Sequence, residues 1–407
     1  MPGSSKRHDP DRPSRLPRDR LAAQIVIGSR NETGFMPPDD TTQPTRPAFP
    51  GASVRLIDVS RHWGAMAALD RISIDVEPGR FTVLLGPSGC GKTTCLRIVA
   101  GLETATEGRV EIAGRDVTNL PPAARGVAMV FQSYALFPHL SVAENIVFGL
   151  KARRVAPRER ARRLARAVEI LGIGHVVHRK PGQLSGGQQQ RVALGRAIVA
   201  EAPVCLMDEP LSNLDAQLRA DMRREILALQ RRLGITMLYV THDQTEAMGM
   251  ADQIVLLRDG HIEQDAPPAE IYARPATSFC ASFIGTPPMN LFPLERRGSG
   301  MVLRGSDGPI LAPPTAGQLL GGIRPENLHL AEQGIAACVR HAEYLGADTV
   351  VACTVGDAPL LARLPGRVVL ADGAPVCLAT EEPIHLFDAA SGSRVGFAAV
   401  EKQTVGA

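Results

Sequence analysis

The stretch Leu84-Leu85-Gly86-Pro87-Ser88-Gly89-Cys90-Gly91-Lys92-Thr93-Thr94 predicts the fold that surrounds it. It fits the pattern Gly-x-x-x-x-Gly-Lys-[Ser/Thr], whose glycines let successive backbone N–H groups point at a polyphosphate. The Lys92 ammonium suits the β- and γ-phosphates, and the Thr93 hydroxyl suits Mg²⁺. An apolar run at 81–85 indicates a strand, and 93–100 indicates a helix, which is the context that a phosphate loop requires. We therefore predict a nucleoside triphosphate site with these loop contacts: Gly86, Pro87, Ser88, Gly89, Cys90, Gly91, Lys92, Thr93 and Thr94.

Composition limits the class of protein. The 407 residues suggest two or three domains, and 45 basic against 42 acidic residues give a net charge of +3. This charge balance does not favour a nucleic acid as partner. The seven cysteines are scattered without a Cys-x-x-Cys pair, which is typical of reduced thiols in a cytosolic protein rather than of disulfides or zinc. No apolar run in the sequence is long enough to cross a bilayer.

Residues 1–52 differ in composition from the rest of the chain. They are rich in proline, charged residues and Ser/Thr, and they contain too few apolar residues for a core, so we predict a disordered extension. The apolar patch 21–27 follows several arginines, as in a signal peptide, but Gln24 interrupts it and no convincing cleavage site follows. A natural tail, or a start codon placed too far upstream, explains this segment better.

Polar residues follow two later apolar runs. The run 204–207 ends in Asp208 and Glu209, of which the first suits Mg²⁺ and the second a general base that polarises water. The next run leads into His242, at the carboxyl end of a strand, where open α/β sheets bind their ligands. Such carboxylates are often only solvated, and such a histidine is sometimes structural. Behind a phosphate loop we predict that Glu209 and His242 are catalytic, together with Lys92.

Three further features need the rest of the chain for their interpretation. Gln132 ends an apolar run after the phosphate loop. The stretch Ser185-Gly186-Gly187-Gln188 opens a helical pattern, and its hydroxyl and free N–H groups suit either an anion or an ordinary helix cap. Trp63, the single tryptophan, lies between two strand-like runs, 54–59 and 72–76, where a partly buried core aromatic is the plainer interpretation.

Taken in order, these residues resemble the nucleotide-binding subunit of an ATP-binding-cassette (ABC) transporter, over nearly everything after Val54. By this resemblance, Trp63 is reassigned as the aromatic that stacks on adenine, and Gln132 joins Thr93 and Asp208 as an Mg²⁺ ligand. The remaining correspondences are Gly86–Thr94 with the Walker A loop, Gln132 with the Q-loop, Ser185, Gly186, Gly187 and Gln188 with the signature motif, Asp208 and Glu209 with the Walker B pair, Ser212–Asp215 with the D-loop, and His242 with the switch histidine.

The resemblance implies an α/β fold, with a P-loop ABC-type ATPase core and a helical subdomain. From residue 286 on, short apolar stretches alternate with Gly, Pro and Asp turns, which indicates a small all-β, OB-like domain of regulatory role. The predicted domains are a disordered extension at 1–52, a nucleotide-binding domain at 53–285 with its helical subdomain at about 133–197, and the OB-like domain at 286–407.

The resemblance also implies partners. Two copies would face head to tail, so that each ATP lies between the Walker A loop of one copy and Ser185, Gly186, Gly187 and Gln188 of the other. The aromatic segment 133–150 would receive a short helix of a membrane subunit, although an internal core role is equally physical. Residues 151–166 are predicted as one helix with a solvated basic face, for which lipid contact is the less favoured alternative. We expect a peripheral protein at the cytoplasmic face of the inner membrane, with two integral-membrane permease subunits and, indirectly, a periplasmic or lipoprotein solute-binding protein.

Four segments of the C-terminal part narrow the subfamily. Residues 283–292 and 322–327 resemble ATPases of carbohydrate importers, and residues 344–348 and 383–388 are most similar to the ATPases of sn-glycerol-3-phosphate importers. Maltose-type or multi-sugar importers remain an alternative. A soluble ABC ATPase of translation or DNA repair would have two cassettes or a long coiled coil, and we see neither an internal repeat nor heptads. A nucleic-acid-binding OB-like domain would need a basic surface with stacking aromatics, which 286–407 lacks.

The cysteine of the loop adds one expectation. Because Cys90 lies inside the predicted phosphate site, a thiol alkylator should block the ATPase activity, and ATP should protect against it.

Overall fold

The structure, a computed structural model, describes residues 51–398. The predicted disorder of the N-terminal extension lies outside the described residues, apart from Gly51 and Ala52. Within residues 51–398, no helix combines the length and the apolar character that crossing a membrane requires.

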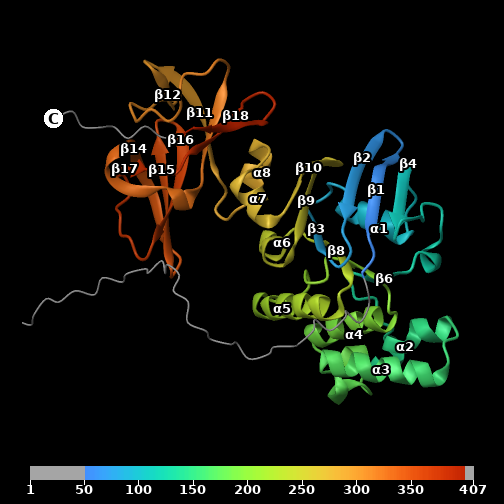
Figure 1. The fold of residues 1–407 in the computed structure, drawn as a ribbon. Helices are drawn as coiled ribbons and strands as arrows, with labels where there is room; N and C mark the ends of the chain where they lie inside the picture. The colour runs from blue at the N-terminus through green and yellow to red at the C-terminus, as the bar shows by residue number, and fades with distance from the viewer. Residues whose placement is uncertain (1–50, 399–407) are drawn as a thin grey trace, which may run out of the picture. The chain divides into compact units, whose positions relative to one another are not determined.

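A six-stranded sheet forms the centre of the part that carries the phosphate loop (Figure 1). Five of its strands are parallel, and the edge strand β10 pairs antiparallel with β9. All residues of β3, β7 and β8 are buried, as expected of parallel strands that are covered on both faces. In sheet order the strands are β10 (His261–Ala266), β9 (Gln253–Arg258), β3 (Phe81–Leu85), β8 (Thr236–Val240), β7 (Val204–Asp208) and β6 (Val127–Val130).

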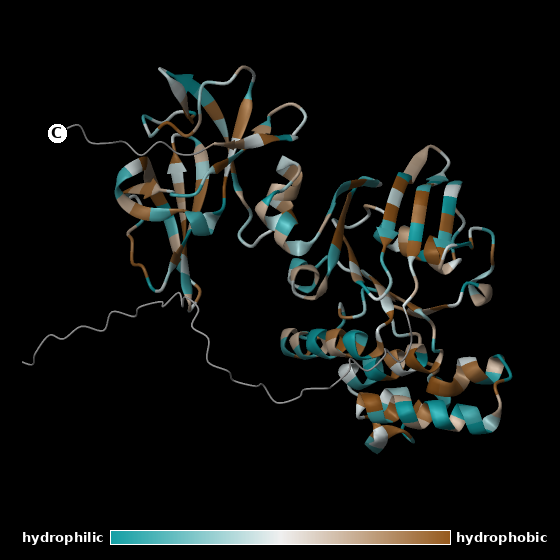
Figure 2. Ribbon diagram, in the orientation of Figure 1, coloured by the Kyte–Doolittle hydropathy of each residue, from teal (hydrophilic) through white to brown (hydrophobic). Residues whose placement is uncertain are grey.

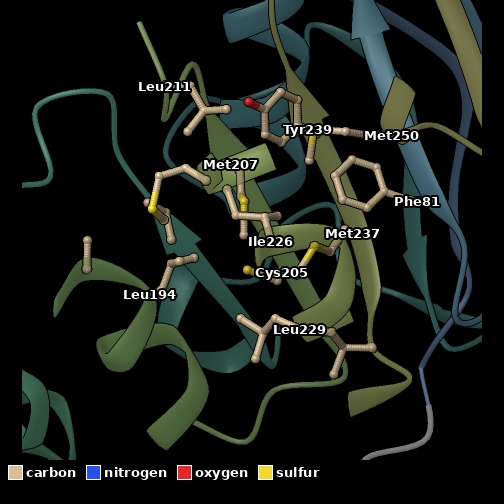
Figure 3. Close-up of a cluster of buried hydrophobic side chains, with 14 of the residues drawn as sticks. Phe81, Leu194, Cys205, Met207, Leu211, Ile226, Leu229, Met237, Tyr239 and Met250 are labelled. Atoms are coloured by element: carbon tan, nitrogen blue, oxygen red, sulfur yellow. The ribbon is translucent and has the colours of Figure 1, made fainter. Parts of the chain in front are cut away.

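Successive residues of these strands enter two different cores. Val83 and Leu85 join one buried cluster, whereas Leu84 between them joins the other. Figure 3 shows part of the first cluster, in which Phe81 and Tyr239 from neighbouring strands have ring centroids 5.6 Å apart. The helices α5 (Ala216–Leu233) and α6 (Gln244–Met250) contribute to this cluster, and Figure 2 shows that α5 is otherwise largely hydrophilic.

The second core lies beneath an antiparallel sheet. The helix α1 (Lys92–Ala100) buries Cys95, Leu96, Ile98 and Val99 in it, and Gly101 ends the helix in the left-handed conformation. The first two strands are longer than predicted and form a hairpin, so Trp63 is the last residue of a strand rather than part of a connection. The strands, in sheet order, are β2 (Met66–Val76), β1 (Val54–Trp63), β4 (Glu107–Ile112) and β5 (Arg115–Asp116), and a short 3₁₀ helix η1 (Pro122–Ala124) follows.

Three helices between β6 and β7 pack on one another, namely α2 (Val142–Ala152), α3 (Pro157–Leu171) and α4 (Gly186–Val199), with the 3₁₀ turns η2 (Gly174–Val176) and η3 (Pro181–Gln183). The prediction of a single helix over 151–166 is wrong. Helix α2 ends at Ala152, and α3 begins at Pro157, because proline has no N–H to donate and is best placed in the first turn of a helix.

After two short helices, α7 (Pro268–Ala273) and α8 (Ser278–Phe283), the described chain up to residue 398 contains only strands and one 3₁₀ turn, which confirms the predicted change of class. Two antiparallel sheets share one core, in which Phe292, Val351 and Leu360 are buried. The first sheet contains β12 (Gly300–Leu303), β11 (Asn290–Arg297), β13 (Leu319–Ile323), β18 (Ile384–Asp388) and β19 (Arg394–Ala398). The second contains β16 (Ala358–Pro365), β15 (Asp348–Val355), β14 (His329–Tyr344) and β17 (Pro375–Ala379), and the turn is η4 (Pro325–Asn327).

Candidate functional site

The phosphate loop connects β3 to α1, and its glycines are required by close packing. A Cβ on Gly91 would lie 2.5 Å from the carbonyl oxygen of Ala68, and one on Gly86 would lie 2.2 Å from that of Leu257. Gly91 also has φ 104°, which is the region that side chains disfavour. By contrast, a Cβ on Gly89 would meet nothing within 4 Å. The loop is therefore packed against β2 and β9 on one side and open beside Gly89.

Lys92 directs its ammonium group into this loop. Nζ donates to the carbonyl oxygens of Gly86 at 2.8 Å and Pro87 at 2.7 Å, and the residue is only 5% exposed. A cation held beside a ring of backbone groups at a helix N-terminus is a site for anionic oxygens.

Thr93 and Asp208 bring the loop and the end of β7 together. The Thr93 hydroxyl donates to Asp208 Oδ1 at 3.0 Å, and burial raises the pKa of this carboxyl group. Carboxylate and hydroxyl oxygens are ligands that Mg²⁺ accepts, and a bound cation would compensate the buried negative charge. Residues 51–398 contain no group of three or more His, Cys, Asp or Glu that could hold a metal, so Mg²⁺ here would need phosphate or water ligands as well.

Gln132 lies at the same place. With Asp208 it lines a pocket of about 270 Å³, and its amide nitrogen donates to Ser212 Oγ at 3.4 Å. Asn213 Nδ2 donates to the Gln132 carbonyl oxygen at 3.1 Å. The segment after β7 thus anchors Gln132 beside the predicted Mg²⁺ ligands.

Glu209 and His242 form a pair at the ends of neighbouring strands. His242 Nδ1 lies 3.2 Å from Glu209 Oε2, and the histidine side chain is 58% exposed. Glu209 has φ 43°, an uncommon value for a non-glycine residue, and its N–H donates to the Val240 carbonyl at 3.1 Å. Strained residues of this kind cluster at functional sites. The arrangement can orient a carboxylate as a general base for water.

Glu246 is a further part of this region, and it was not identified from the sequence. It is 4% exposed, and its Oε2 accepts hydrogen bonds from the Tyr239 and Thr241 hydroxyl groups, both at 2.8 Å. Burial raises its pKa. Because Thr241 directly precedes His242, this carboxylate fixes the backbone that carries the histidine. Its position three residues after Asp243, the N-cap of α6, resembles that of a capping-box glutamate, which concealed its partners.

Ser185 caps helix α4. Its hydroxyl accepts from the Gln188 N–H at 3.4 Å, and Gln188 Oε1 accepts from the Ser185 N–H at 3.1 Å, so the capping interpretation is confirmed. A Cβ on Gly187 would lie 2.9 Å from Leu218 Cδ1, which explains why a glycine packs there against α5. Within residues 51–398, no hydrogen bond joins Ser185 or Gln188 to the phosphate loop. Thr93, Asp208 and Gln132 thus lie together, and Glu209 follows Asp208 and pairs with His242, whereas the signature segment makes no such link within residues 51–398.

Trp63 is not a core aromatic. It is 44% exposed, and the Arg61 guanidinium lies 5.4 Å from its ring centroid. It pairs with Met66 at the end of the β1–β2 hairpin, whose residue Ala68 contacts the phosphate loop at Gly91. An exposed ring at this place suits stacking on a planar ligand.

Cys90 lies buried within the phosphate loop. The thiol is 4% exposed, and burial raises its pKa although Lys92 opposes this effect. Because the thiolate is the reactive form, we expect slow alkylation of Cys90.

The aromatic segment 133–150 divides between core and surface. Tyr134 is buried in the core, whereas Phe148 is 42% exposed and packs on Phe137 with ring centroids 4.3 Å apart. Phe148, Arg153 and residues of β6 and α4 line a pocket of about 180 Å³, and a second pocket of about 190 Å³ shares Arg153 and Met129 with it. We call these two pockets the α2 groove.

A phosphate loop, a strand-end Asp-Glu pair and a histidine beside it, all at the carboxyl ends of parallel strands, define a P-loop ATPase. Comparisons with known proteins give its family. The model described as ABC transporter matches residues 69–212, and the model described as TOBE domain matches residues 321–387.

The chain is 46% identical over 348 residues to the sn-glycerol-3-phosphate import ATP-binding protein UgpC of Ruegeria sp. (strain TM1040), covering 84% of this chain and 99% of the relative. It is 47% identical over 352 residues to the sulfoquinovosyl glycerol transport ATP-binding protein SmoE of Agrobacterium fabrum, covering 83% and 98%. Among solved structures, the ADP conformation of MJ1267, an ATP-binding cassette of an ABC transporter, matches with a TM-score of 0.50 and 27% identity over 55% of this chain and 96% of that one.

The chain belongs to the ABC transporter family. It is an ATP-binding subunit whose ATPase activity is coupled to transport, and the predicted resemblance and fold class are confirmed.

Proposed function

We propose that the chain is the ATP-hydrolysing subunit of an importer for sn-glycerol-3-phosphate, and that it works as a pair of copies beneath two membrane permease subunits. The Glu209–His242 pair, 3.2 Å apart beside the linked Thr93 and Asp208, is the observation that carries the hydrolytic role. The similarity to UgpC proteins over nearly their full length supports sn-glycerol-3-phosphate as the transported solute.

ATP would bind with its phosphates in the loop from Gly86 to Thr94 and its adenine against Trp63. Lys92 would exchange the two carbonyl oxygens that it now contacts for phosphate oxygens. Thr93 and Asp208, with Gln132, would hold Mg²⁺, which neutralises charge on the phosphate oxygens when bound.

Glu209 would accept the proton of the attacking water, whose oxygen forms the new bond to the γ-phosphorus while the bond to ADP breaks. His242 would orient this carboxylate through Nδ1, and its largely exposed side chain would face the γ-phosphate. Glu246 holds the strand end beneath His242.

The signature segment would act on the ATP of a second copy. Ser185, Gly186, Gly187 and Gln188 begin helix α4, whose N-terminal N–H groups and dipole favour an anion, and in a head-to-tail homodimer they would cover the γ-phosphate from the far side. The absence of any link between Ser185 and the loop of the same chain, within residues 51–398, agrees with such a shared site.

The α2 groove would receive a short segment of each permease subunit, because it combines exposed Phe148 with two arginines, Arg153 and Arg196. We place the chain peripherally at the cytoplasmic face of the inner membrane, with a periplasmic or lipoprotein solute-binding protein as an indirect partner. We also propose three structural units: a nucleotide-binding domain at 53–285, its helical subdomain at about 133–197, and a regulatory OB-like domain at 286–407. We propose no nucleic acid as a partner.

Purification of the tagged chain from its native membrane tests the assembly. We expect two permease subunits to co-purify, whereas ribosomes or DNA would overturn the importer in favour of a soluble ABC ATPase. The ATPase activity of the reconstituted complex is then measured with binding proteins that carry sn-glycerol-3-phosphate, maltose or sulfoquinovosyl glycerol, the last because of the similarity to SmoE. Stimulation by maltose or sulfoquinovosyl glycerol alone would contradict the proposed solute, and Glu209→Gln is the inactive control.

A further inference from the structure

The backbone directly after Gln132 adopts a costly conformation. Tyr134 has φ 60° and Ala135 has φ 46°, so two consecutive non-glycine residues lie in the left-handed region. Each such residue is disfavoured on steric grounds, and a pair persists only where the surroundings enforce it. The turn is closed by the Tyr134 N–H, which donates to the Phe131 carbonyl oxygen at 2.9 Å.

One side chain of the signature helix supplies the enforcement. Arg196, in the last turn of α4, donates from Nη1 to the carbonyl oxygens of both Tyr134 and Ala135. Its guanidinium carbon also lies 5.5 Å from the ring centroid of Phe137. No ion pair of Arg196 occurs within residues 51–398, so its charge is directed at these backbone carbonyls.

The opposite side of the turn is fixed to the segment after β7. Gln132 is held there by Ser212 and Asn213, as described above. The loop is thus attached to the Walker B side at Gln132 and to the signature helix at Tyr134 and Ala135. Without the attachment at Tyr134 and Ala135, the position of Gln132 in the pocket that it shares with Asp208 would depend on its contacts with Ser212 and Asn213.

We propose that Arg196 is a positioning residue, which holds the left-handed turn at Tyr134–Ala135 and so couples the signature helix α4 to the placement of Gln132. A movement of α4 then displaces Gln132 through this contact, and an occupant of the α2 groove, which Arg196 also lines, bears on the same turn. The proposal deepens the proposed function, because it rests on the role of Gln132 beside Mg²⁺.

Arg196 could instead have only a structural role, in which its side chain fills space at the edge of the core. A glycine substitution in the turn distinguishes this role from the proposed coupling. Glycine adopts positive φ without steric cost, so Ala135→Gly stabilises the same turn without Arg196. If Arg196 holds the turn, Ala135→Gly rescues Arg196→Met. If Arg196 fills space, the glycine has no effect on the defect.

The test compares Arg196→Met, Arg196→Lys, Ala135→Gly and the double variant Arg196→Met/Ala135→Gly in the full chain. Arg191→Met is the matched control, because Arg191 is on the same helix but pairs with Glu225 of α5 at 3.0 Å. The first readout, hydrogen exchange of residues 131–137 by mass spectrometry, needs no nucleotide. The second is the ATPase activity, resolved into kcat and the apparent KM for Mg²⁺.

We expect Arg196→Met to speed exchange in this segment by roughly tenfold, the factor for one disfavoured left-handed residue. The apparent KM for Mg²⁺ rises by a similar factor with a smaller change in kcat. The double variant returns the exchange rate and the apparent KM for Mg²⁺ towards their wild-type values. Arg196→Lys gives values between those of wild type and Arg196→Met, and Arg191→Met changes neither.

Unchanged exchange in Arg196→Met, or a defect that Ala135→Gly does not rescue, would overturn the proposal. If exchange responds and is rescued while the apparent KM for Mg²⁺ stays constant, the contact with the turn stands and the role of Gln132 in the proposed function fails.

Discussion

Replacing Glu246 tests how the position of His242 is maintained. The carboxylate is 4% exposed and accepts hydrogen bonds from the hydroxyl groups of Tyr239 and Thr241, both at 2.8 Å. Leucine would fill a similar volume without accepting either bond. Glutamine would keep an acceptor oxygen for both hydroxyl groups but would bury a new amide nitrogen.

The expected loss in the free energy of unfolding follows from the two hydroxyl donors that Glu246→Leu leaves without an acceptor. A buried unsatisfied donor costs about 1–3 kcal/mol, so two cost about 2–6 kcal/mol, reduced to about 2–4 kcal/mol because a buried charge is removed as well. This corresponds to a fall of about 5–15 °C in the melting temperature of a domain of this size. For Glu246→Gln we expect the free energy of unfolding to fall by about 1 kcal/mol.

Differential scanning calorimetry of the full chain measures these shifts. Glu270→Leu is the control, because Glu270 takes the same first-turn position in the short helix α7 but is exposed. We also expect kcat of the ATPase to fall by about 10- to 100-fold in Glu246→Leu, since a displaced catalytic group loses activity to this extent.

The pH dependence of Glu246→Gln provides a second check. Burial raises the pKa of Glu246 above its ordinary value of 4.5 in the folded state. The stability from this shift is therefore fully present below the unfolded pKa and is lost as the pH rises through the folded pKa. The difference in melting temperature between wild type and Glu246→Gln should narrow as the pH rises from 4.5. A wild-type melting temperature in Glu246→Leu, or a difference that widens with pH, would refute this reasoning.

Three further predictions concern the phosphate loop and its neighbour. Cys90 should react with iodoacetamide at least about tenfold more slowly than exposed Cys338 at pH 7.5, as mass spectrometry of peptides measures, and equal rates would contradict its burial and raised pKa. Gly91→Ala should lower ATPase activity by at least about 100-fold, because its Cβ would lie 2.5 Å from the Ala68 carbonyl oxygen, and near-wild-type activity in a folded variant would refute that packing. Trp63→Ala should leave the melting temperature unchanged but raise the apparent KM for ATP by about 2- to 12-fold, whereas a large loss of stability would indicate a core role.

The site residues that could be predicted from the sequence are those whose role depends on residues next to them in the sequence. The phosphate loop, Asp208 and Glu209 follow buried strands directly, so the order of strand, turn and polar group was enough to place them at one edge of a parallel sheet. Helix α5 likewise has local end signals, because its N-cap is Asp215 and Gly234 ends it in the left-handed conformation.

What could not be predicted depends on contacts between distant segments. The partners of Glu246 are Tyr239 on the preceding strand and Thr241 just after it, and a glutamate in the first turn of a helix gives no indication of such partners. Nothing near Tyr134 in the sequence indicates that its carbonyl meets Arg196, 62 residues later. The break between α2 and α3 was missed because arginines on both sides continued a helical composition across Pro157.

The central claim is that each ATP is held between the phosphate loop of one copy and the signature segment of another. Sedimentation velocity of Glu209→Gln tests it most directly, because loss of the general base slows hydrolysis by about 10²- to 10⁴-fold and lets the ATP-bound state accumulate. With Mg²⁺ and ATP, the account predicts a dimer that returns to monomer with ADP and is abolished by adding Ser185→Arg. A Glu209→Gln chain that binds ATP yet stays monomeric, or one that hydrolyses ATP at the wild-type rate, would contradict it.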